Sequence, residues 1–154
     1  MTDPGTQHID GDKKDTVLSL NPVQAQLLEK TPFVGFLGIE LIESSGELLY
    51  QLTFRDQHIG NPLLRTFHGG ILASFGEISA ALHVTGVLGL DGEPYCDSMT
   101  FDYLRPAFAG TLRAVPRIIR SGKRFIIVSV DIYLDQTLVS IGRFIYTRKS
   151  AIAG

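Results

Sequence analysis

The alternation of hydrophobic and polar residues divides the first half of the chain into short elements. Residues 21–30 (NPVQAQLLEK) predict a short helix, because an Asn followed by Pro suits the N-cap and first helical position. Residues 31–38 look like an apolar connector broken by glycine. Residues 39–54 alternate as strand, turn and strand, which predicts one hairpin or one long bent strand. Glycine and proline in residues 55–67 predict a loop.

The segment from 69 to 88 is the only candidate for a long helix. Large apolar side chains recur in it at helical spacing, at Ile71, Phe75, Ile78 and Leu82. Most of the remaining positions hold Ala, Ser or Gly, so the helix is apolar on nearly all sides. We therefore expect it to be buried rather than to lie on a surface.

The second half of the chain contains strand patterns only. We place strands near 96–105, 109–120, 123–134 and 137–147, joined by tight turns in an antiparallel meander. Their apolar runs are too continuous for a sheet with one face in water, which suggests that a partner subunit covers the second face. The fold class is therefore α+β, with a curved antiparallel sheet of about five or six strands around one central helix.

Length and composition define the type of protein. The 154 residues suit a single domain, which we place at 17–150 after a polar tail at 1–16 that we expect to be disordered. A net charge of −2 argues against a nucleic-acid partner. We see neither a targeting segment nor an apolar stretch approaching a membrane span, so we expect no membrane partner. The single cysteine, Cys96, excludes an intrachain disulfide and suits a cytoplasmic protein.

Two adjacent glycines, Gly69 and Gly70, open the long helix directly after His68. Glycine is unfavourable in a helix, so a close approach of another molecule to the backbone would explain the pair. The first N–H groups of a helix lack internal partners and lie at its positive end. The Gly69 N–H is our candidate for holding a carbonyl oxygen that becomes negative during a reaction. The alternative is a tight junction packed against the sheet.

Glu77 is the only charged residue between His68 and Leu90. It follows Gly70 by seven residues, which places both on almost the same helix face, about 10 Å apart along the axis. Small neighbours leave room for another molecule beside it. A buried carboxylate needs a raised pKa or a partner, which makes Glu77 a candidate catalytic group. The alternative is a structural Glu bonded to the backbone or to a neighbouring subunit.

Two polar residues near the helix start are further candidates. His68 can orient a substrate or donate a hydrogen bond to its carbonyl, and can equally cap the helix. Asn61 can position a water or a thioester, and can equally be an ordinary turn residue. The chain has no HExxH, paired CxxC or GxSxG motif, so we expect neither a metal site nor a serine hydrolase.

Four motifs occur in order along residues 33–148. They are Asn61 with His68-Gly69-Gly70 and an acid nine residues after the histidine, Tyr103-Leu104-Arg105-Pro106-Ala107 with Gly110, Gly122-Lys123-Arg124, and Gly142 to Thr147. Together they resemble the hotdog-fold thioesterases, in the PaaI-like branch of the 4-hydroxybenzoyl-CoA thioesterase superfamily. That branch usually has Asp where this chain has Glu77, and its Asn lies one residue nearer to the histidine.

The resemblance implies an acyl-CoA thioesterase that releases a small aromatic or a short- or medium-chain acid. Glu77 would act as nucleophile or general base, with the Gly69 N–H as oxyanion hole. Cys96 or Ser98, expected on one strand face, would bond to the carboxylate or the water from across a dimer interface. The protein would be a homodimer or a dimer of dimers with its active sites at the dimer interface. No cofactor is expected, because coenzyme A is part of the substrate.

Cations are expected near the phosphates of coenzyme A. Lys123 and Arg124 are the candidates, with Arg105 and Arg120 behind them, although a solvated turn explains these residues equally well. Two other functions remain open. One is a hotdog hydratase or dehydratase acting on an enoyl thioester, and the other is a non-catalytic acyl-CoA-binding protein.

Overall fold

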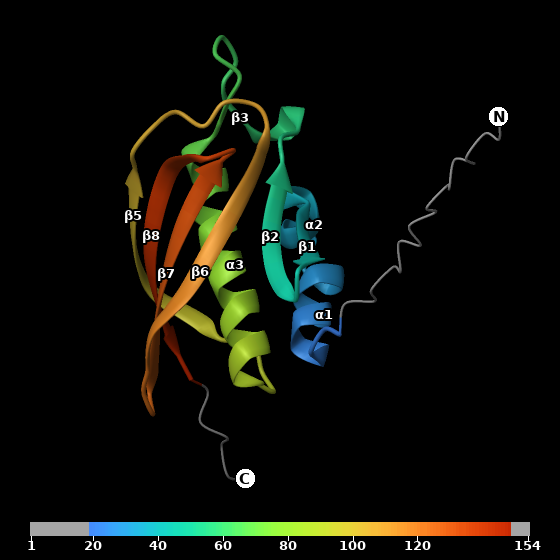
Figure 1. The fold of residues 1–154 in the computed structure, drawn as a ribbon, viewed down its shortest axis with the longest axis vertical. Helices are drawn as coiled ribbons and strands as arrows, with labels where there is room; N and C mark the ends of the chain where they lie inside the picture. Colours follow the sequence, from blue (N-terminus) through green and yellow to red (C-terminus); the bar gives the residue numbers. More distant parts are fainter. Residues whose placement is uncertain (1–18, 149–154) are drawn as a thin grey trace, which may run out of the picture.

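The computed structural model describes residues 19–148, so the tail expected at 1–16 lies outside the described residues. One long helix runs along the concave side of a curved sheet, and two short helices lie beside the first strands (Figure 1). The helices are α1 (Pro22–Lys30), α2 (Pro32–Leu37) and α3 (Gly69–Leu88), with a 3-10 turn η1 (Asp56–His58). The α+β hotdog architecture predicted from the sequence is confirmed.

Six strands form the main sheet in the order β1-β2-β6-β7-β8-β5, and all neighbours are antiparallel. A separate two-stranded ribbon, β3 with β4, precedes α3. The strands are β1 (Ile39–Ser44), β2 (Glu47–Thr53), β3 (Ile59–Asn61), β4 (Thr66–Phe67), β5 (Tyr95–Tyr103), β6 (Thr111–Ser121), β7 (Phe125–Leu134) and β8 (Thr137–Thr147).

The first helix forms as predicted, whereas the connector after it does not. Asn21 caps α1 by accepting a hydrogen bond from the Val23 N–H, and Gln24 completes a capping box. Residues 32–37 form helix α2 instead of an irregular connector. Pro32 has the backbone geometry of a first helical residue, and Gly38 ends the helix in a left-handed conformation, with φ of 72°.

Residues 39–54 form a hairpin, which resolves the alternative of one long bent strand. Ser45 and Gly46 both have positive φ in its two-residue turn, as a type I′ turn requires. The prediction of a plain loop at 55–67 is wrong in part, because η1, β3 and β4 lie within it. Such very short elements carry too few residues to show a period in the sequence.

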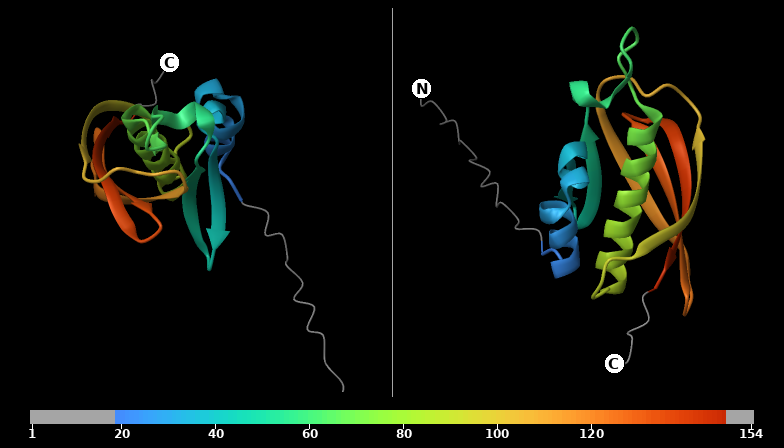
Figure 2. Two further views of the ribbon diagram at one scale, coloured as in Figure 1. Left: turned by 90° about the horizontal axis from the view of Figure 1, so that it is seen from above. Right: turned by 180° about the vertical axis from the view of Figure 1, so that it is seen from behind.

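The long helix matches the predicted bounds, and Gly89 ends it with a left-handed conformation. The sheet curves around α3, and β5, the strand at the edge of the sheet, also contacts this helix (Figure 2). Our expectation of no apolar stretch long enough for a membrane is wrong, because α3 alone among the described helices meets that test. Its packing inside the sheet explains the composition, since 56% of its most apolar window is buried.

The strand positions are correct to within a few residues, but the strand order is not a simple meander. Strands β6, β7 and β8 follow one another as predicted, whereas β5 pairs with β8 at the far edge of the sheet. The connection from β5 to β6 therefore passes over the sheet to the other side of β7 and β8 (Figure 1). This crossover depends on long-range pairing, which the sequence pattern of one strand does not encode.

Candidate active site

The start of α3 is organised by His68, which is its N-cap. The ring Nδ1 accepts a 2.9 Å hydrogen bond from the Gly70 N–H, as the capping alternative predicted. Because Nδ1 is an acceptor, a neutral His68 carries its proton on Nε2, where it is free to donate. His68 is exposed, so capping the helix and donating to a substrate are compatible.

Gly69 lies against the ring of Tyr103, which comes from the end of β5. A Cβ on Gly69 would lie 3.1 Å from the Tyr103 ring, and the Tyr103 hydroxyl donates a 2.9 Å hydrogen bond to the Gly69 carbonyl. The glycine therefore fits the tight junction given as the alternative, where a Cβ would require the Tyr103 ring to shift by a few tenths of an ångström. Its N–H nevertheless has no hydrogen-bond partner within residues 19–148, so it remains able to hold a substrate oxygen.

A shallow cavity of about 300 Å³ adjoins this junction. It lies between the start of α3 and the segment that follows β5, and its lining includes Phe67, Gly69, Tyr103, Arg105 and Pro106. The sequence motif contains Tyr103 but does not indicate its contact with Gly69. That contact depends on the position of β5, which ends beside the helix start.

Glu77 lies in the middle of α3 and is half-buried, as predicted. Burial raises the pKa of its carboxyl above the ordinary value of 4.5, and the negative charge of Glu93 raises it further. Among residues 19–148 the Glu77 carboxylate has no ion-pair or hydrogen-bond partner. A carboxylate that is poorly solvated and unpaired is suited to act as a base or a nucleophile.

Two residues on neighbouring strands lie close to Glu77. Tyr146 of β8 donates a 2.5 Å hydrogen bond to the main-chain carbonyl of Glu77. Cys96 of β5 pairs with Tyr146, and burial followed by the negative charge of Glu77 raises the pKa of its thiol. The thiol donates a 3.5 Å hydrogen bond to the Ser98 carbonyl, not to the carboxylate.

Ser98 does not share a strand face with Cys96, contrary to our expectation. Cys96 pairs with Tyr146 but Ser98 pairs with Ile145, so a bulge at Asp97 adds one residue to β5. Because cross-strand partners share a face, Cys96 lies on the inner face with Tyr146 and Ser98 lies on the outer face with Ile145. Counting by twos along the sequence cannot detect such a bulge.

Asn61 closes the turn between β3 and β4. Its side-chain oxygen accepts hydrogen bonds of 3.0 Å and 3.1 Å from the N–H groups of Leu63 and Leu64. The side chain is exposed, and the hydrogen bonds are those of the turn residue that we gave as the alternative.

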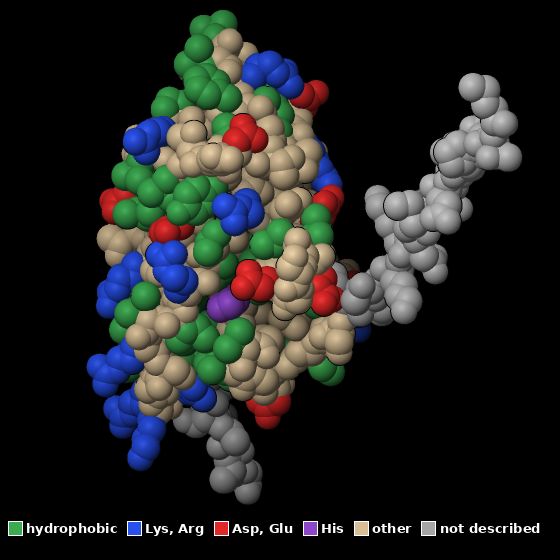
Figure 3. Space-filling view, in the orientation of Figure 1, with side chains coloured by type: hydrophobic (Ala, Val, Ile, Leu, Met, Phe, Trp, Pro, Cys, Tyr) green, Lys and Arg blue, Asp and Glu red, His purple; other side chains and the backbone are tan. Residues whose placement is uncertain are grey.

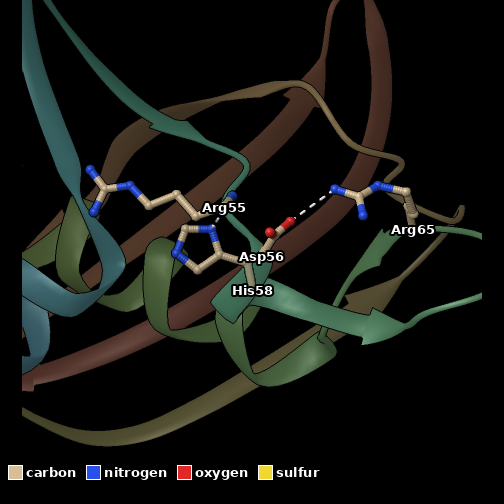
Figure 4. Close-up of polar contacts among 4 residues, drawn as sticks. All are labelled: Arg55, Asp56, His58 and Arg65. Carbon is tan, nitrogen blue, oxygen red and sulfur yellow. Dashed lines mark hydrogen bonds and ion pairs between the residues drawn. The ribbon is translucent and has the colours of Figure 1, made fainter.

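A polar cluster lies directly behind the helix start (Figure 4). The His68 N–H donates a 2.8 Å hydrogen bond to the carbonyl of His58. The ring Nδ1 of His58 accepts a hydrogen bond from the Arg55 N–H at 3.1 Å. Burial lowers the pKa of His58, so its ring is neutral near pH 7. Asp56 and Arg65 form an exposed ion pair of 3.0 Å beside it. The cluster fixes the backbone that leads into the N-cap.

The candidate cations are divided between the two ends of the fold. Lys123 and Arg124 lie in the turn from β6 to β7, which with Arg120 lines a shallow cavity of about 260 Å³. That turn is at the opposite end of the sheet from the start of α3 (Figure 1). Lys and Arg side chains gather over the lower end of this face (Figure 3). Arg105, a second-choice candidate, instead lines the cavity at the helix start together with Gly69.

Comparisons with known proteins identify the family of the chain. Residues 64–141, which include His68 and Glu77 but not Asn61, match the family model described as the thioesterase superfamily. No curated protein sequence matches the chain.

Solved structures resemble the chain over most of its length. A protein from the thioesterase superfamily is 28% identical, covers 84% of this chain and 98% of its own, and has a TM-score of 0.74. The Escherichia coli PaaI protein from the phenylacetic acid degradation operon is 29% identical over 74% of this chain and 86% of its own, with a TM-score of 0.63.

A third structure contains a ligand. The BH2602 protein from Bacillus halodurans, solved with CoA, is 28% identical over 76% of this chain and 75% of its own, with a TM-score of 0.65. The family match, the PaaI-like neighbours and the six-stranded sheet around α3 agree with one another. The chain therefore belongs to the thioesterase superfamily, as a PaaI-like hotdog protein whose activity is thioester hydrolysis.

Proposed function

We propose that the protein hydrolyses a small aromatic or a short- or medium-chain acyl-CoA to the free acid and coenzyme A. The observation that carries the proposal is the half-buried Glu77 carboxyl, whose pKa is raised and which lies on a helix that begins with an unpartnered Gly69 N–H. The similar Bacillus halodurans protein solved with CoA supports coenzyme A as the carrier.

The reaction uses the Gly69 N–H at the start of α3 and the Glu77 carboxylate in the middle of the same helix. The thioester carbonyl accepts a hydrogen bond from the Gly69 N–H, which stabilises the negative charge that develops on oxygen. The Glu77 carboxylate attacks the carbonyl carbon, or removes a proton from an attacking water. The His68 Nε2–H donates to the same carbonyl or orients the thioester, and Asn61 orients the attacking water. The thiolate of coenzyme A then leaves with the electrons of the broken C–S bond. On the nucleophilic route a water then hydrolyses the anhydride formed with Glu77, which releases the acid and restores the carboxylate, and on the general-base route the proton held by Glu77 passes to the leaving thiolate.

The distance between these groups favours a dimeric site. Gly69 and Glu77 of one chain are eight residues apart, which separates them by about 12 Å along the helix axis. One carbonyl group cannot contact both, so we propose that Glu77 acts on a thioester held at the Gly69 of a second subunit. A homodimer formed along the exposed β5 edge, or a dimer of such dimers, would provide this arrangement.

The same arrangement accounts for the two ends of the substrate. In a dimer with antiparallel β5 edges, the β6–β7 turn of one subunit would lie at the same end as the helix start of the other, because the two features lie at opposite ends of each chain (Figure 1). Lys123 and Arg124, with Arg120 beside them, would then hold the phosphates of coenzyme A. Gly70, Cys96 and Ser98 would line the site, with Ser98 contacting the partner subunit from the outer strand face.

Two observations support a small aromatic acyl group. The cavity of about 300 Å³ is lined by Phe67, Tyr103 and Pro106 together with Gly69, whose N–H would hold the thioester carbonyl. The similar Escherichia coli protein comes from a phenylacetic acid degradation operon. Phenylacetyl-CoA and short aliphatic acyl-CoAs are therefore the first substrates to assay.

A free-thiol release assay over aromatic, short and long acyl-CoAs tests the proposal. We expect wild type to hydrolyse an aromatic or short acyl-CoA, and the Glu77→Gln variant to lose at least about a hundredfold in kcat. Full activity in Glu77→Gln would exclude the proposed role. Hydration of an enoyl-CoA without thiol release would indicate a hydratase instead. Tight acyl-CoA binding without any turnover would indicate a binding protein.

A further inference from the structure

A second cleft opens where β2 separates from β6. These strands pair only over Tyr50–Thr53 and Thr111–Ala114, and the first part of β2 then diverges from the rest of β6. Pro116 lies just beyond the last pair, where its missing N–H needs no partner on β2. The opening leads to α3 and encloses a cavity of about 460 Å³. Figure 3 shows the molecule from the side on which β2 and β6 are seen in Figure 1, and charged and hydrophobic side chains lie next to one another there.

The floor of this cleft contains a histidine–tyrosine pair. The Tyr50 hydroxyl lies 3.3 Å from Nδ1 of His83, and the two rings meet edge to face. Burial raises the pKa of Tyr50 to about 12, so its hydroxyl keeps its proton and can donate to Nδ1 when the His83 ring carries its proton on Nε2. Burial also lowers the pKa of His83, which favours the neutral ring, and the tautomer that accepts from Tyr50 places the ring proton on Nε2.

The proton on Nε2 of His83 is available to a ligand. Within residues 19–148, Nε2 has no hydrogen-bond partner, and His83 lines the cavity. The donor is fixed in place by the Tyr50 hydroxyl and by the packing of α3 against the sheet. A fixed donor beside an open cavity selects a ligand with an oxygen acceptor.

The cleft is separate from the proposed active site. His83 follows Glu77 by six residues, which turns it about 120° away around the helix and about 9 Å along the axis. None of Gly69, Glu77 and Cys96 lines the cavity. A ligand bound there does not occupy the thioester site of the same chain.

The walls and rim indicate which ligand fits. Most of the wall is apolar, formed by Leu48, Leu49, Val87, Val115 and Pro116. Arg113 also lines the cavity, but it lies on the opposite face of β6 from Ala114, the strand partner of Tyr50, and its guanidinium lies over Tyr133 on that face. The Arg113 guanidinium stacks on Tyr133 and has no ion-pair partner among residues 19–148.

The negative charge at the rim lies at the other end. Glu47 precedes Tyr50 by three residues on β2, which separates them by about 10 Å along the strand. A carboxylate head beside His83 would therefore stay away from Glu47. We propose that the cleft binds a monocarboxylic acid with an apolar body, with its carboxylate on the His83 ring and its tail against Val87 and Val115, while the positive charge of Arg113 in the cavity lining attracts the acid. The volume falls within the usual range for small-molecule sites.

Isothermal titration of octanoate into the full chain tests this site. We expect octanoate to bind and to shift the His83 ring signals in an NMR spectrum, and octylamine, which has the same chain length and a positive head, not to bind. Val87→Trp should fill the cleft and weaken octanoate binding at least about tenfold, and His83→Phe should weaken it about tenfold by removing the donor. Val87 is 62% exposed, so the tryptophan should not prevent folding.

The matched control is Ile119→Trp, at a residue that is 60% exposed and does not line the cleft. It should leave octanoate binding unchanged. The proposal is overturned if octanoate does not bind, or if Val87→Trp binds it as tightly as wild type. It is also overturned if Glu77→Gln abolishes octanoate binding, since the acid would then occupy the thioester site. None of these measurements requires thioester hydrolysis, so failure of the proposed function would leave this test intact.

Discussion

The Tyr146 hydroxyl donates a 2.5 Å hydrogen bond to the main-chain carbonyl of Glu77, which joins strand β8 to the middle of α3. Tyr146 is almost fully buried, and its strand partner on β5 is Cys96. The sheet thus holds the turn of the helix that carries the carboxylate, without pairing the carboxylate itself. The position of Glu77 is fixed while its charge remains available.

Removal of this hydroxyl should weaken both stability and activity. Tyr146→Phe leaves the ring in place and loses one buried hydrogen bond, which should lower the free energy of unfolding by about 1 kcal/mol. Because Glu77 is then less firmly positioned, we expect kcat to fall while KM changes little. Urea denaturation and steady-state kinetics measure the two effects. Tyr133→Phe, on a partly exposed ring of β7, is the control and should change neither quantity appreciably.

The raised pKa of Glu77 should appear in the pH dependence of activity. A base or nucleophile must be ionised, so kcat/KM should rise with pH, with a midpoint above 4.5. Glu93 contributes to the shift through its negative charge, so Glu93→Gln should move the midpoint to lower pH. A midpoint at or below 4.5 in wild type, or no movement in Glu93→Gln, would contradict this assignment.

The same shift predicts that Glu77 destabilises the fold at neutral pH. The folded-state pKa is raised, so the folded chain favours the protonated carboxyl and ionisation costs stability as pH rises through that pKa. Glu77→Gln should therefore have a higher Tm than wild type near pH 7. The difference should vanish below the unfolded-state pKa, where wild type is also neutral. Melting curves across this pH range measure it, and a variant that is less stable at pH 7 would oppose the prediction.

The main elements of the site could be predicted from the sequence because they lie close together along the chain. The glycine pair, the helix that follows it and the isolated Glu77 all lie within one helix, where a period of 3.6 residues relates them directly. The contacts of Tyr103 with Gly69 and of Tyr146 with Glu77 join residues 34 and 69 positions apart. They follow from the strand order β7-β8-β5, which no single segment specifies. The bulge at Asp97 likewise changed the face of Ser98 without any mark in the pattern.

A mixture of two inactive variants tests whether one site uses two subunits. Glu77→Gln lacks the carboxylate, and Gly69→Ala places a Cβ 3.1 Å from the Tyr103 ring, which should displace the N–H that holds the carbonyl. If each site combines Gly69 of one subunit with Glu77 of the other, a heterodimer of the two variants contains one intact site.

Unfolding and refolding the variants together at equal amounts should then restore about a quarter of wild-type activity, since half of the dimers are mixed and each holds one working site. Each variant refolded alone is the control and should stay inactive. Activity of the mixture that equals the mean of the separate variants would show that Gly69 and Glu77 do not act across an interface. A single chain would then have to bring the thioester to both residues, despite their separation of about 12 Å along α3.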